Sequence, residues 1–597
     1  MIDVNRFSKS LRDRSDAHHP QFSIFPSRRS LVLGRKGIVA SPNALASSAG
    51  LEILNNGGNA ADASIATAAV LSLVDPSMCG LGGDGFSMFY ESSSKSLRGI
   101  NGSGRSPASL NLNLLKNSLG GLDLKANQIP IDSIHAITVP GACGCWIDTI
   151  KNFGSGKLSL SEILRPAIEL AKEGFPVSEI SSWTWKNSQD HLLKTINGAQ
   201  VLLKEGQTYR APQTGELMFN LDLARTFEEI ADKGWEGFYK GRVAQGIVNV
   251  IKSQGGVIEL SDLNAHTSSL VQPISKTYNP FDKDKEKITL HELPPNGQGL
   301  TALMALGILE SLEKRGIVKM NKLEPNSAPW IHTLIECLRL AFADTRAYIA
   351  DPDIVYVPTL ELLDKDYLFD RSLEFNLYRA QVDIQKGSPM RNQETVYLTC
   401  NDKEGNACSF IMSNYTDFGS GIVPDGCGFV LQNRGSNFNL QEGHPNCIEP
   451  KKRPYHTIIP AMVTKGDDLF LSFGVMGGFM QPQGHLQVLM NIINGNYNVQ
   501  SALDCPRFCI SGGTPSPSNE LVNDINGIIY LEEGIKLSVV EELKRMGHKV
   551  ELVKDHQRSM FGRGQVIQKV KSYNGDDQTV WVAGSDPRAD GQAVCQV

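Results

Sequence analysis

The chain has 597 residues, of which 41% are hydrophobic and 20% are charged, and its formal net charge is −6. These values are typical of a large globular protein that buries its own core, and the slightly acidic balance argues against a nucleic-acid partner. No apolar run reaches the roughly 18 residues of a membrane-spanning helix, and the polar N-terminus lacks the apolar part of a signal peptide, so we expect a cytoplasmic protein without a membrane partner.

The N-terminal part of the chain alternates between short strands and small helices. Residues 1–36 are expected to form a loosely ordered arm, in which Phe25–Ser30 can dock on the body. A strand is predicted for Gly37–Ser41 and another for Phe86–Tyr90, which follows a glycine-rich loop. Alanine-rich sequence predicts helices over Ala44–Leu54 and Ala60–Val74, and their small side chains favour close packing in a buried layer.

The middle of the chain, residues 160–350, is predicted to be mostly helical. The clearest helical patterns cover Leu160–Glu173 and Ala328–Ile349. Between them, Leu293–Gly299 contains two prolines and two glycines, which exclude regular structure there.

From Thr395 onward the pattern changes to strands. Thr395–Cys400 and Ala407–Ser413 are predicted to pair as a hairpin around Asn401–Asn406. Further strands are predicted at Gly428–Gln432, Thr457–Val463 and Leu469–Phe473, and a C-terminal portion contains Asp504–Arg507 and Glu551–Val553. Strands and helices alternate in both halves, which favours a layered α/β protein.

Thr395 offers an unusual chemistry. A polar run, 386–393, ends at Glu394, and the strand pattern then begins with this threonine. An internal threonine is a poor nucleophile, but cleavage of the preceding bond would give it an α-amine with a pKa of about 7.7–8.0 that can act as its base. The ordinary alternative is a structural threonine, since threonine is common at strand starts.

Other residues are candidates to support such a nucleophile. Gly477 and Gly478 follow a strand and can present two backbone N–H groups to an oxyanion, although a simple turn would also explain them. Ser413, on the strand next to Thr395, can orient the nucleophile or its amine. Arg105, Arg434 and His456 are candidates for binding a substrate carboxylate, with solvated side chains as the alternative.

The eleven cysteines follow no metal-ligand spacing. Cys143-x-Cys145 and Cys505-x3-Cys509 have no matching second pair, so zinc is not expected. We expect free thiols buried in a protein of a reducing compartment.

Six stretches, in this order and spacing, resemble the γ-glutamyltransferase (glutathione hydrolase) family of N-terminal-nucleophile hydrolases. They are Gly57–Ala63, Gly80–Asp84, Val139–Gly141, Asp402–Ala407, Phe418–Ile422 and Met476–Gly478. The resemblance runs from about Gly37 to the C-terminus and implies a four-layer αββα sandwich. Pro26–Ser30 and Arg453–Pro460 further resemble an intracellular, glutathione hydrolase-like branch of that family.

The resemblance also implies a mechanism. The chain would cut itself between Glu394 and Thr395, and the arm 1–36, the large subunit 37–394 and the small subunit 395–597 would stay interlocked as one structural unit. Such heterodimers can pair further, which the sequence leaves open. Thr395 would then attack a small-molecule amide, Gly477 and Gly478 would hold the oxyanion, and Ser413 stands where the family has a second, supporting threonine. No cofactor or metal is needed.

The substrate-binding positions depart from the family. The usual Thr-Thr-His after the cut is Thr395-Val396-Tyr397 here. The positions that bind the γ-glutamyl amino group, usually Asn, Gln and Asp, are Tyr415, Arg434 and Asn437, and the Ser-Ser pair that holds the carboxylate is His456-Thr457. Arg105 lies two positions beyond the family's carboxylate-binding arginine. We therefore expect retained catalytic residues and a changed pocket.

Three functions follow from these expectations. The first is γ-glutamyl hydrolysis and transfer on glutathione-like donors, which the family favours. The second is an amidohydrolase or acylase for another carboxylate-bearing amide, such as an oxamate-like or acyl side-chain substrate, which Arg105, Arg434 and His456 favour. The third is a non-catalytic binding protein, against which Thr395 and the paired glycines argue.

Overall fold

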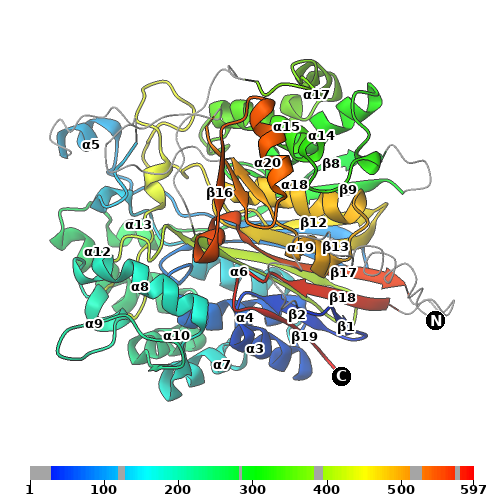
Figure 1. Ribbon diagram of the computed structural model, residues 1–597. Coiled ribbons are helices and arrows are strands. Elements are labelled where there is room, and N and C mark those ends of the chain that lie inside the picture. Colours follow the sequence, from blue (N-terminus) through cyan, green and yellow to red (C-terminus); the bar gives the residue numbers. More distant parts are fainter. Residues whose placement is uncertain (1–28, 119–127, 281–285, 382–393, 511–526, 572–578) are drawn as a thin grey trace.

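Two seven-stranded sheets lie face to face at the centre of the molecule, and helices cover the outer face of each sheet (Figure 1). The computed structural model describes residues 29–118, 128–280, 286–381, 394–510, 527–571 and 579–597. This arrangement is the four-layer αββα sandwich that the family resemblance implies.

All strand pairs within the two central sheets are antiparallel. In spatial order, one sheet contains β1 (Val32–Gly34), β18 (Thr579–Ser585), β17 (Arg563–Lys571), β13 (Asp468–Met476), β12 (Ala461–Lys465), β9 (Ile288–Glu292) and β8 (Ile274–Tyr278). The other contains β19 (Gln592–Cys595), β2 (Ile38–Ser41), β10 (Glu394–Asn401), β11 (Ala407–Tyr415), β3 (Asp84–Glu91), β4 (Ser96–Gly102) and β7 (Ser269–Val271). The sheets meet where β10 and β11 contact β13 and where β10 contacts β17.

Each sheet has its own helical cover. The β10 sheet is covered by α3 (Ala44–Asn55), α4 (Ala60–Val74) and α6 (Ala142–Phe153), with α7 (Leu160–Glu173) and α10 (Leu221–Lys233) outside them. The β13 sheet is covered by α14 (Gly299–Lys314), α18 (Met480–Ile493) and α19 (Val499–Asp504), with α15 (Ala328–Tyr348), α17 (Lys365–Ser372) and α20 (Leu537–Arg545) further out.

The remaining elements are short or peripheral. They are α5 (Leu112–Ser118), α8 (Glu179–Leu193), α9 (Gly198–Leu202), α11 (Glu236–Tyr239), α12 (Gly241–Ser253), α13 (Leu260–Asn264), α16 (Thr359–Leu362), β5 (Phe175–Pro176) with β6 (Leu217–Met218), and the small sheet β14 (Phe508–Ile510), β15 (Ile529–Glu532) and β16 (Val550–Val553). The described residues also contain the 3₁₀ turns η2 (Ile134–Ala136), η3 (Met320–Lys322), η4 (Arg434–Asn437) and η5 (Asp555–Phe561).

Helix α4 illustrates how the sequence produces the layers. Asn59 caps its first turn and forms a capping box with Asp62, which satisfies N–H groups that would otherwise be left without acceptors. All fifteen residues of the helix are buried, because it lies between the β10 sheet and α7. Alanine and serine dominate it, and their small side chains permit this close approach.

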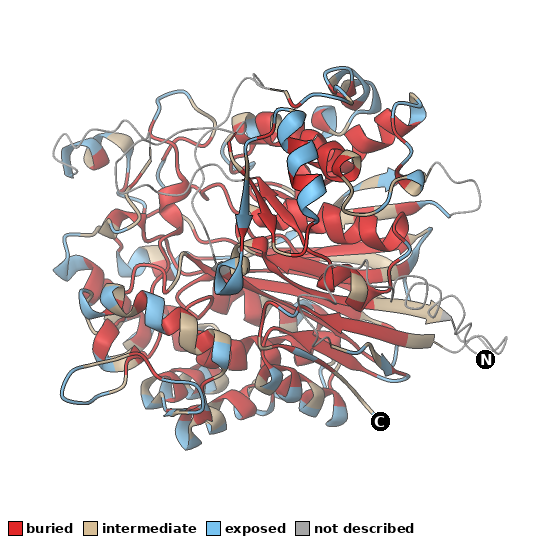
Figure 2. Cartoon of the chain, viewed as in Figure 1, coloured by how far each residue is buried: buried red, intermediate tan, exposed pale blue. Residues whose placement is uncertain are grey.

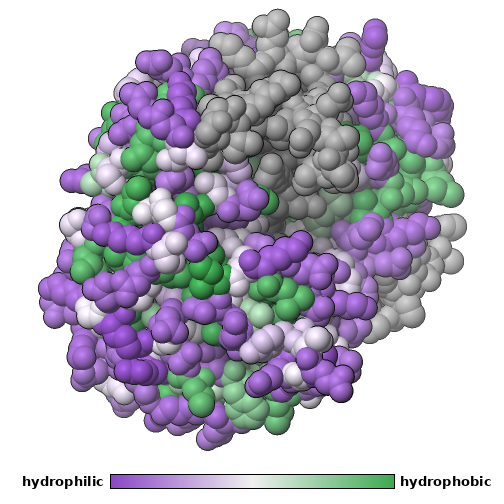
Figure 3. Space-filling view, turned by 90° about the vertical axis from the view of Figure 1, so that its left-hand side faces the viewer, coloured by the Kyte–Doolittle hydropathy of each residue, from purple (hydrophilic) through white to green (hydrophobic). Residues whose placement is uncertain are grey.

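Two large clusters of buried apolar side chains fill the interfaces between the helices and the sheets. Figure 2 shows both central sheets almost wholly buried, whereas exposed residues concentrate on the outer helices. All eleven cysteines are free and ten of them are buried, as expected from the sequence. On the face drawn in Figure 3, hydrophilic side chains alternate with small apolar areas. No described helix combines the length and apolarity that membrane crossing requires.

The described end of the N-terminal arm is part of the body rather than loose. Arg29 donates hydrogen bonds to the carbonyl oxygens of Asp586 and Ala589, at 2.6 and 2.5 Å. Strand β1 then pairs with β18 at the sheet edge. The docking predicted around Phe25–Ser30 is thus seen at Arg29, and residues 1–28 lie outside the described part of the chain.

Two strand predictions and one helical prediction differ from the structure. Gly428–Gln432 is buried but is not a strand: its backbone bonds to loops, with Gln432 N–H donating to the Gly82 carbonyl at 3.0 Å. Strand β12 begins at Ala461 rather than Thr457. Within the stretch predicted to be mostly helical, β7, β8 and β9 complete the edges of the two sheets.

Candidate active site

Thr395 lies at an irregularity in the pairing of β10 with β11. Glu394 pairs with Tyr415 and Val396 pairs with Met412, so Thr395 faces two residues of β11 instead of one. Such a bulge locally re-aims side chains. Tyr415 has a φ of +82°, an uncommon value for a residue with a side chain and one that recurs at functional sites.

Two side chains contact the Thr395 hydroxyl. Its Oγ1 donates to Ser413 Oγ at 3.3 Å and accepts from Gln481 Nε2 at 3.4 Å. Gln481 is held in place because its Oε1 accepts the Ile459 N–H at 2.9 Å. Thr395 is fully buried while Glu394 is still attached to it in the same strand.

The paired glycines form the turn between β13 and α18. Gly477 has a φ of +123° and Gly478 a φ of +55°, both in the region that favours glycine. Among the described residues, no acceptor engages either glycine N–H. The Gly478 carbonyl accepts from the Gln481 N–H at 3.1 Å and from Gln298 Nε2 at 2.8 Å. Gln481 therefore joins this turn to Thr395, and two backbone donors are left available beside it.

Arg434 places a positive charge against Ser413. Its Nη2 donates to Ser413 Oγ at 3.0 Å, its Nη1 donates to Thr457 Oγ1 at 2.6 Å, and its guanidinium lies 4.4 Å from the centre of the Tyr415 ring. Burial lowers its pKa to about 10, so it remains charged at neutral pH. In the described part of the chain no carboxylate lies within ion-pair distance of it, and Asp84 acts on it only from farther away.

His456 fixes the loop that carries Thr457. Its Nε2 lies 3.0 Å from Asp84 Oδ2, its Nδ1 accepts the Ile458 N–H at 3.3 Å, and its ring packs on Phe86. Burial, with repulsion from Arg434, lowers the pKa of His456 to about 4. The ring is therefore neutral at neutral pH, donates to Asp84 through Nε2 and holds the loop in place.

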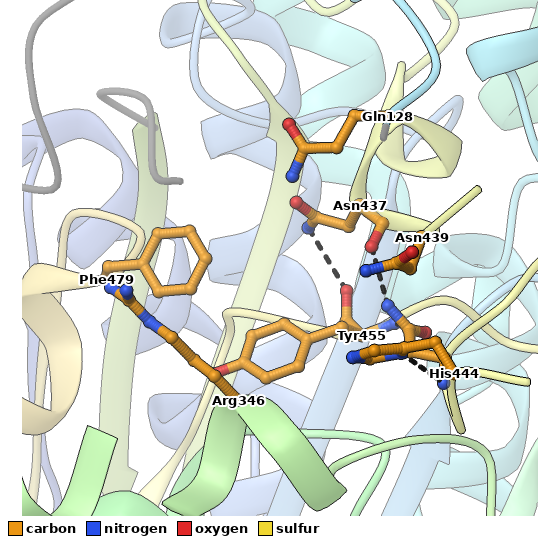
Figure 4. A pocket seen from close by; sticks show the side chains of 8 residues that line it. Gln128, Arg346, Asn437, Asn439, His444, Tyr455 and Phe479 are labelled. Atoms are coloured by element: carbon orange, nitrogen blue, oxygen red, sulfur yellow. Dashed lines mark hydrogen bonds between the residues drawn. The ribbon is translucent and has the colours of Figure 1, made fainter. Parts of the chain in front are cut away.

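A small cavity lies beside this group. Tyr415 donates its hydroxyl to Asn437 Oδ1, and Asn437 Nδ2 donates to the Tyr455 carbonyl at 3.1 Å. Asn437 and Tyr455 line a cavity of about 40 Å³ (Figure 4), with Phe479, the residue after Gly478, on another wall. Gln128, Arg346, Asn439, His444 and Asn446 complete the lining, and Thr395 is not part of it.

Most residues selected from the sequence come together here. Thr395, Ser413, Arg434 and Thr457 form one chain of contacts, and Tyr415 and Asn437 extend it to the cavity. Arg105 is placed elsewhere: its Nη1 donates to the Thr267 carbonyl at 3.1 Å and its Nη2 to Asp353 at 3.4 Å.

Sequence reasoning missed Gln481, Gln298 and Arg346. Gln481 had a usable signal, since it is a polar residue one turn after Gly477-Gly478 and next to Pro482, which marks a helix start. Gln298 belongs to the loop Leu293–Gly299, which was recognised only as irregular. Arg346 carries no local signal, because its role depends on which side chains surround it.

A separate buried group, His332, Glu336 and His548, brings three potential metal-ligand atoms within 4.8 Å of one another. These atoms already have partners: His332 Nδ1 lies 2.8 Å from His548 Nε2, and Arg339 pairs with Glu336 at 3.0 Å. The cluster is accounted for as a hydrogen-bonded network.

Comparison with known proteins places this architecture in a family. The family model described as gamma-glutamyltranspeptidase matches residues 46–595. The chain is 35% identical to the glutathione hydrolase-like YwrD proenzyme of Bacillus subtilis, over 94% of this chain and 99% of that protein, and 29% identical to the oxamate amidohydrolase proenzyme of Klebsiella pneumoniae, over 94% and 98%. The crystal structure of cephalosporin acylase from Bacillus halodurans superimposes with a TM-score of 0.83 and 36% identity, covering 96% of this chain and 98% of that one. The chain belongs to the gamma-glutamyltranspeptidase family, a family of hydrolases with the N-terminal-nucleophile fold.

Proposed function

We propose that this protein is a self-processing amidohydrolase in which Thr395 is first the cleavage residue and then the nucleophile. The observation that carries the proposal is the position of the Thr395 hydroxyl. It lies between Ser413 Oγ and Gln481 Nε2, and Gln481 ties it to the turn with the two unengaged glycine N–H groups. The names of the relatives, several of them proenzymes, support the same chemistry.

The first step is intramolecular. Thr395 Oγ1 attacks the carbonyl carbon of Glu394, an ester bond forms as the peptide bond breaks, and the hydroxyl proton ends on the departing nitrogen. Water then hydrolyses the ester, which gives Glu394 a carboxylate and Thr395 a free hydroxyl and α-amine. The products are the fragments 1–394 and 395–597.

The second step repeats this chemistry on a substrate. The α-amine of Thr395 accepts the hydroxyl proton as the oxygen attacks the substrate amide, and the N–H groups of Gly477 and Gly478 stabilise the oxyanion. The amine proton passes to the leaving amine, and water resolves the acyl-enzyme; an acceptor amine in place of water would give transfer. Ser413 Oγ also accepts a hydrogen bond from Arg434 Nη2, which holds Ser413 in place, and Ser413 keeps the Thr395 hydroxyl aligned.

For the substrate, we propose a carboxylate-bearing amide other than a γ-glutamyl compound, hydrolysed in the cytoplasm. Arg434 stands where the family binds an amino group with neutral and acidic side chains, and a buried cation repels a substrate ammonium. The acylase and oxamate amidohydrolase names of relatives support this choice, whereas the glutathione hydrolase names support the γ-glutamyl alternative.

The test begins with the purified protein on a denaturing gel. We expect two fragments, the smaller one starting Thr-Val-Tyr, and a single full-length band that persists for days would refute self-processing. Thr395→Ala should abolish both cleavage and turnover, whereas Thr395→Ser should keep part of each because its hydroxyl remains. A γ-glutamyl chromogenic amide should be released weakly or not at all, and turnover as fast as that of N-acyl carboxylate amides would favour the γ-glutamyl alternative.

A further inference from the structure

Arg346 is a buried cation without a counter-ion among the residues that the structure describes. It lies near the end of α15, is 8% exposed, and its Nε and Nη1 atoms are buried without a hydrogen-bond partner. Its guanidinium stacks near Phe342 and Phe479, 5.4 and 5.9 Å from the ring centres. Within the described ranges, no carboxylate lies at ion-pair distance from it. Burial lowers its pKa to about 10, so it is charged at neutral pH.

Two other buried arginines of the described chain are neutralised by a carboxylate. Arg507 pairs with Asp586 at 2.6 Å, and Arg588 pairs with the same carboxylate at 3.0 Å. A buried charge is normally retained only when it is paired, and a buried polar group without a partner usually has a function or an absent ligand. Arg434 also has no carboxylate at ion-pair distance among the described residues, but its two Nη atoms donate to hydroxyl groups, whereas Nε and Nη1 of Arg346 have no partner. Arg346 therefore needs an explanation.

Arg346 faces the cavity described above. Figure 4 shows Arg346 and Phe479 on one side of it and the amides of Gln128, Asn437 and Asn439 on the other. None of the eight lining residues is acidic. A water molecule needs about 10–15 Å³ of such space, so a cavity of about 40 Å³ holds roughly three water-sized groups, which is the size of a carboxylate.

The cavity is coupled to the catalytic group from two directions. Asn437 accepts the Tyr415 hydroxyl, and the Tyr415 ring lies under Arg434, which contacts Ser413. On the other side, Tyr455 donates to Gln298 Oε1 at 3.3 Å, and Gln298 donates to the Gly478 carbonyl. The cavity is therefore linked to Thr395 through the contacts of Tyr415, Arg434 and Ser413, and to the oxyanion turn through Gln298.

We propose that this cavity is an anion subsite in which Arg346 binds a carboxylate of the substrate, several bonds from the scissile amide. The inference rests on the proposed amidohydrolase function and assigns the carboxylate to Arg346 rather than to Arg105 or Arg434. Arg105 is engaged by Asp353, and Arg434 already donates to two hydroxyl groups. Guanidinium and carboxylate match because two N–H donors can reach two oxygens in one plane. The substrate class is a monoamide of a dicarboxylic acid.

The test compares matched substrates. Chromogenic succinyl, glutaryl and adipyl monoamides are assayed beside their terminal methyl esters, which have the same length without the charge. The processed protein should prefer one acid over its ester in kcat/KM. Arg346→Met should lower that preference about 10- to 100-fold, the effect of one charge-assisted pair, mainly through KM for the acid. Arg346→Lys, which keeps the charge, should restore part of it.

Two further measurements make the result decisive. Arg165→Met, at an exposed ion pair far from this cavity, is the control for loss of one positive charge. If Arg105→Met removes the preference and Arg346→Met does not, the subsite is at Arg105 and the inference is wrong. In the uncleaved Thr395→Ala protein, glutarate should raise the melting temperature more than glutaramide does, and Arg346→Met should remove the difference.

The failure of the inference and of the proposed function can be told apart. Cleavage and amide turnover without a preference for the acids, and no effect of glutarate, would overturn the subsite alone. Absence of cleavage and turnover would overturn the proposed function, while the glutarate titration would still report on Arg346.

Discussion

Replacement of Gly477 by alanine is a direct test of the turn that we assign to the oxyanion. Gly477 has a φ of +123°, which a residue with a side chain rarely adopts, and the added methyl carbon would lie 3.1 Å from Gly562 Cα. The contacted atom, Gly562 Cα, belongs to the backbone, and Gly562 itself has a positive φ of +72°. It therefore cannot move aside as the end of a flexible side chain would. The turn must therefore shift, and its N–H groups shift with it.

The expected effects on stability and on rate have different sizes. A residue forced into a sparsely populated backbone region costs about 1–3 kcal/mol. Loss of one oxyanion donor costs roughly 10²–10³-fold in rate. Gly477→Ala should therefore remain folded, because a large domain tolerates this strain, while it loses most of its turnover.

The control is Gly466→Ala at the other end of β13. Gly466 has a φ of +57° and no atom lies within 4 Å of the added methyl, so only the backbone strain, about 1–2 kcal/mol, applies. The melting temperature, measured by calorimetry, reports the loss of stability, and the kinetics with one substrate report the loss of turnover. A Gly477→Ala protein with wild-type processing and turnover would refute the assignment of these amides to the oxyanion.

The remaining predictions concern the side chains around Thr395. Gln481→Leu removes the donor to the Thr395 hydroxyl and should slow both fragment formation and turnover about 10-fold or more, measured by mass spectrometry over time and by kinetics, whereas equal rates would exclude a role in alignment. Ser413→Thr keeps the hydroxyl and should retain most activity, whereas Ser413→Ala leaves Arg434 Nη2 without its acceptor and should lower both activity and stability, the latter by about 1–3 kcal/mol in urea unfolding. The pKa of His456 is about 4 in the folded protein against an ordinary value of 6.5, so on acidification the unfolded chain binds the proton first. The contribution of His456 to the free energy of unfolding is therefore complete above pH 6.5 and is lost as the pH falls towards 4, by up to about 3 kcal/mol. His456→Gln should therefore flatten the pH dependence of the free energy of unfolding in that range, and an unchanged slope would contradict the low pKa.

Local signals were sufficient for many elements of the fold. Ala60–Val74 and Leu160–Glu173 have the predicted bounds, because each begins with a capping box that the sequence displays. The hairpin of β10 and β11 was predicted from alternation and from the turn between them. By contrast, the run Phe429-Val430-Leu431 has the composition of a strand, but its neighbours are loops, and a strand exists only if a partner offers its backbone.

The catalytic candidates were partly predictable for a different reason. Thr395, Ser413, Gly477 and Gly478 were candidates from their local patterns, and the resemblance to a family strengthened them; the contact between Thr395 and Ser413 is local to one hairpin. Gln481 and Gln298 act through their side-chain amides across distant segments, which no spacing in the sequence reports. Arg346 could not be selected from the sequence either, because an arginine on a helix is usually solvated. Only its packing against Phe342 and Phe479 in the structure shows that it is buried.

The strand order gives a cut at Glu394–Thr395 an unusual mechanical outcome. Strands from after the cut pair with strands from before it at β19–β2, β2–β10 and β11–β3 in one sheet, and at β1–β18 and β12–β9 in the other. The two fragments could separate only if the strand pairs of both sheets broke together. Dilution alone should therefore not dissociate them. If the two fragments were expressed as separate chains, each would lack the strands that complete its sheets. We expect that they would have to associate before either could fold. Cleavage here would create one carboxylate and one amine and would leave the strand pairing of both sheets intact.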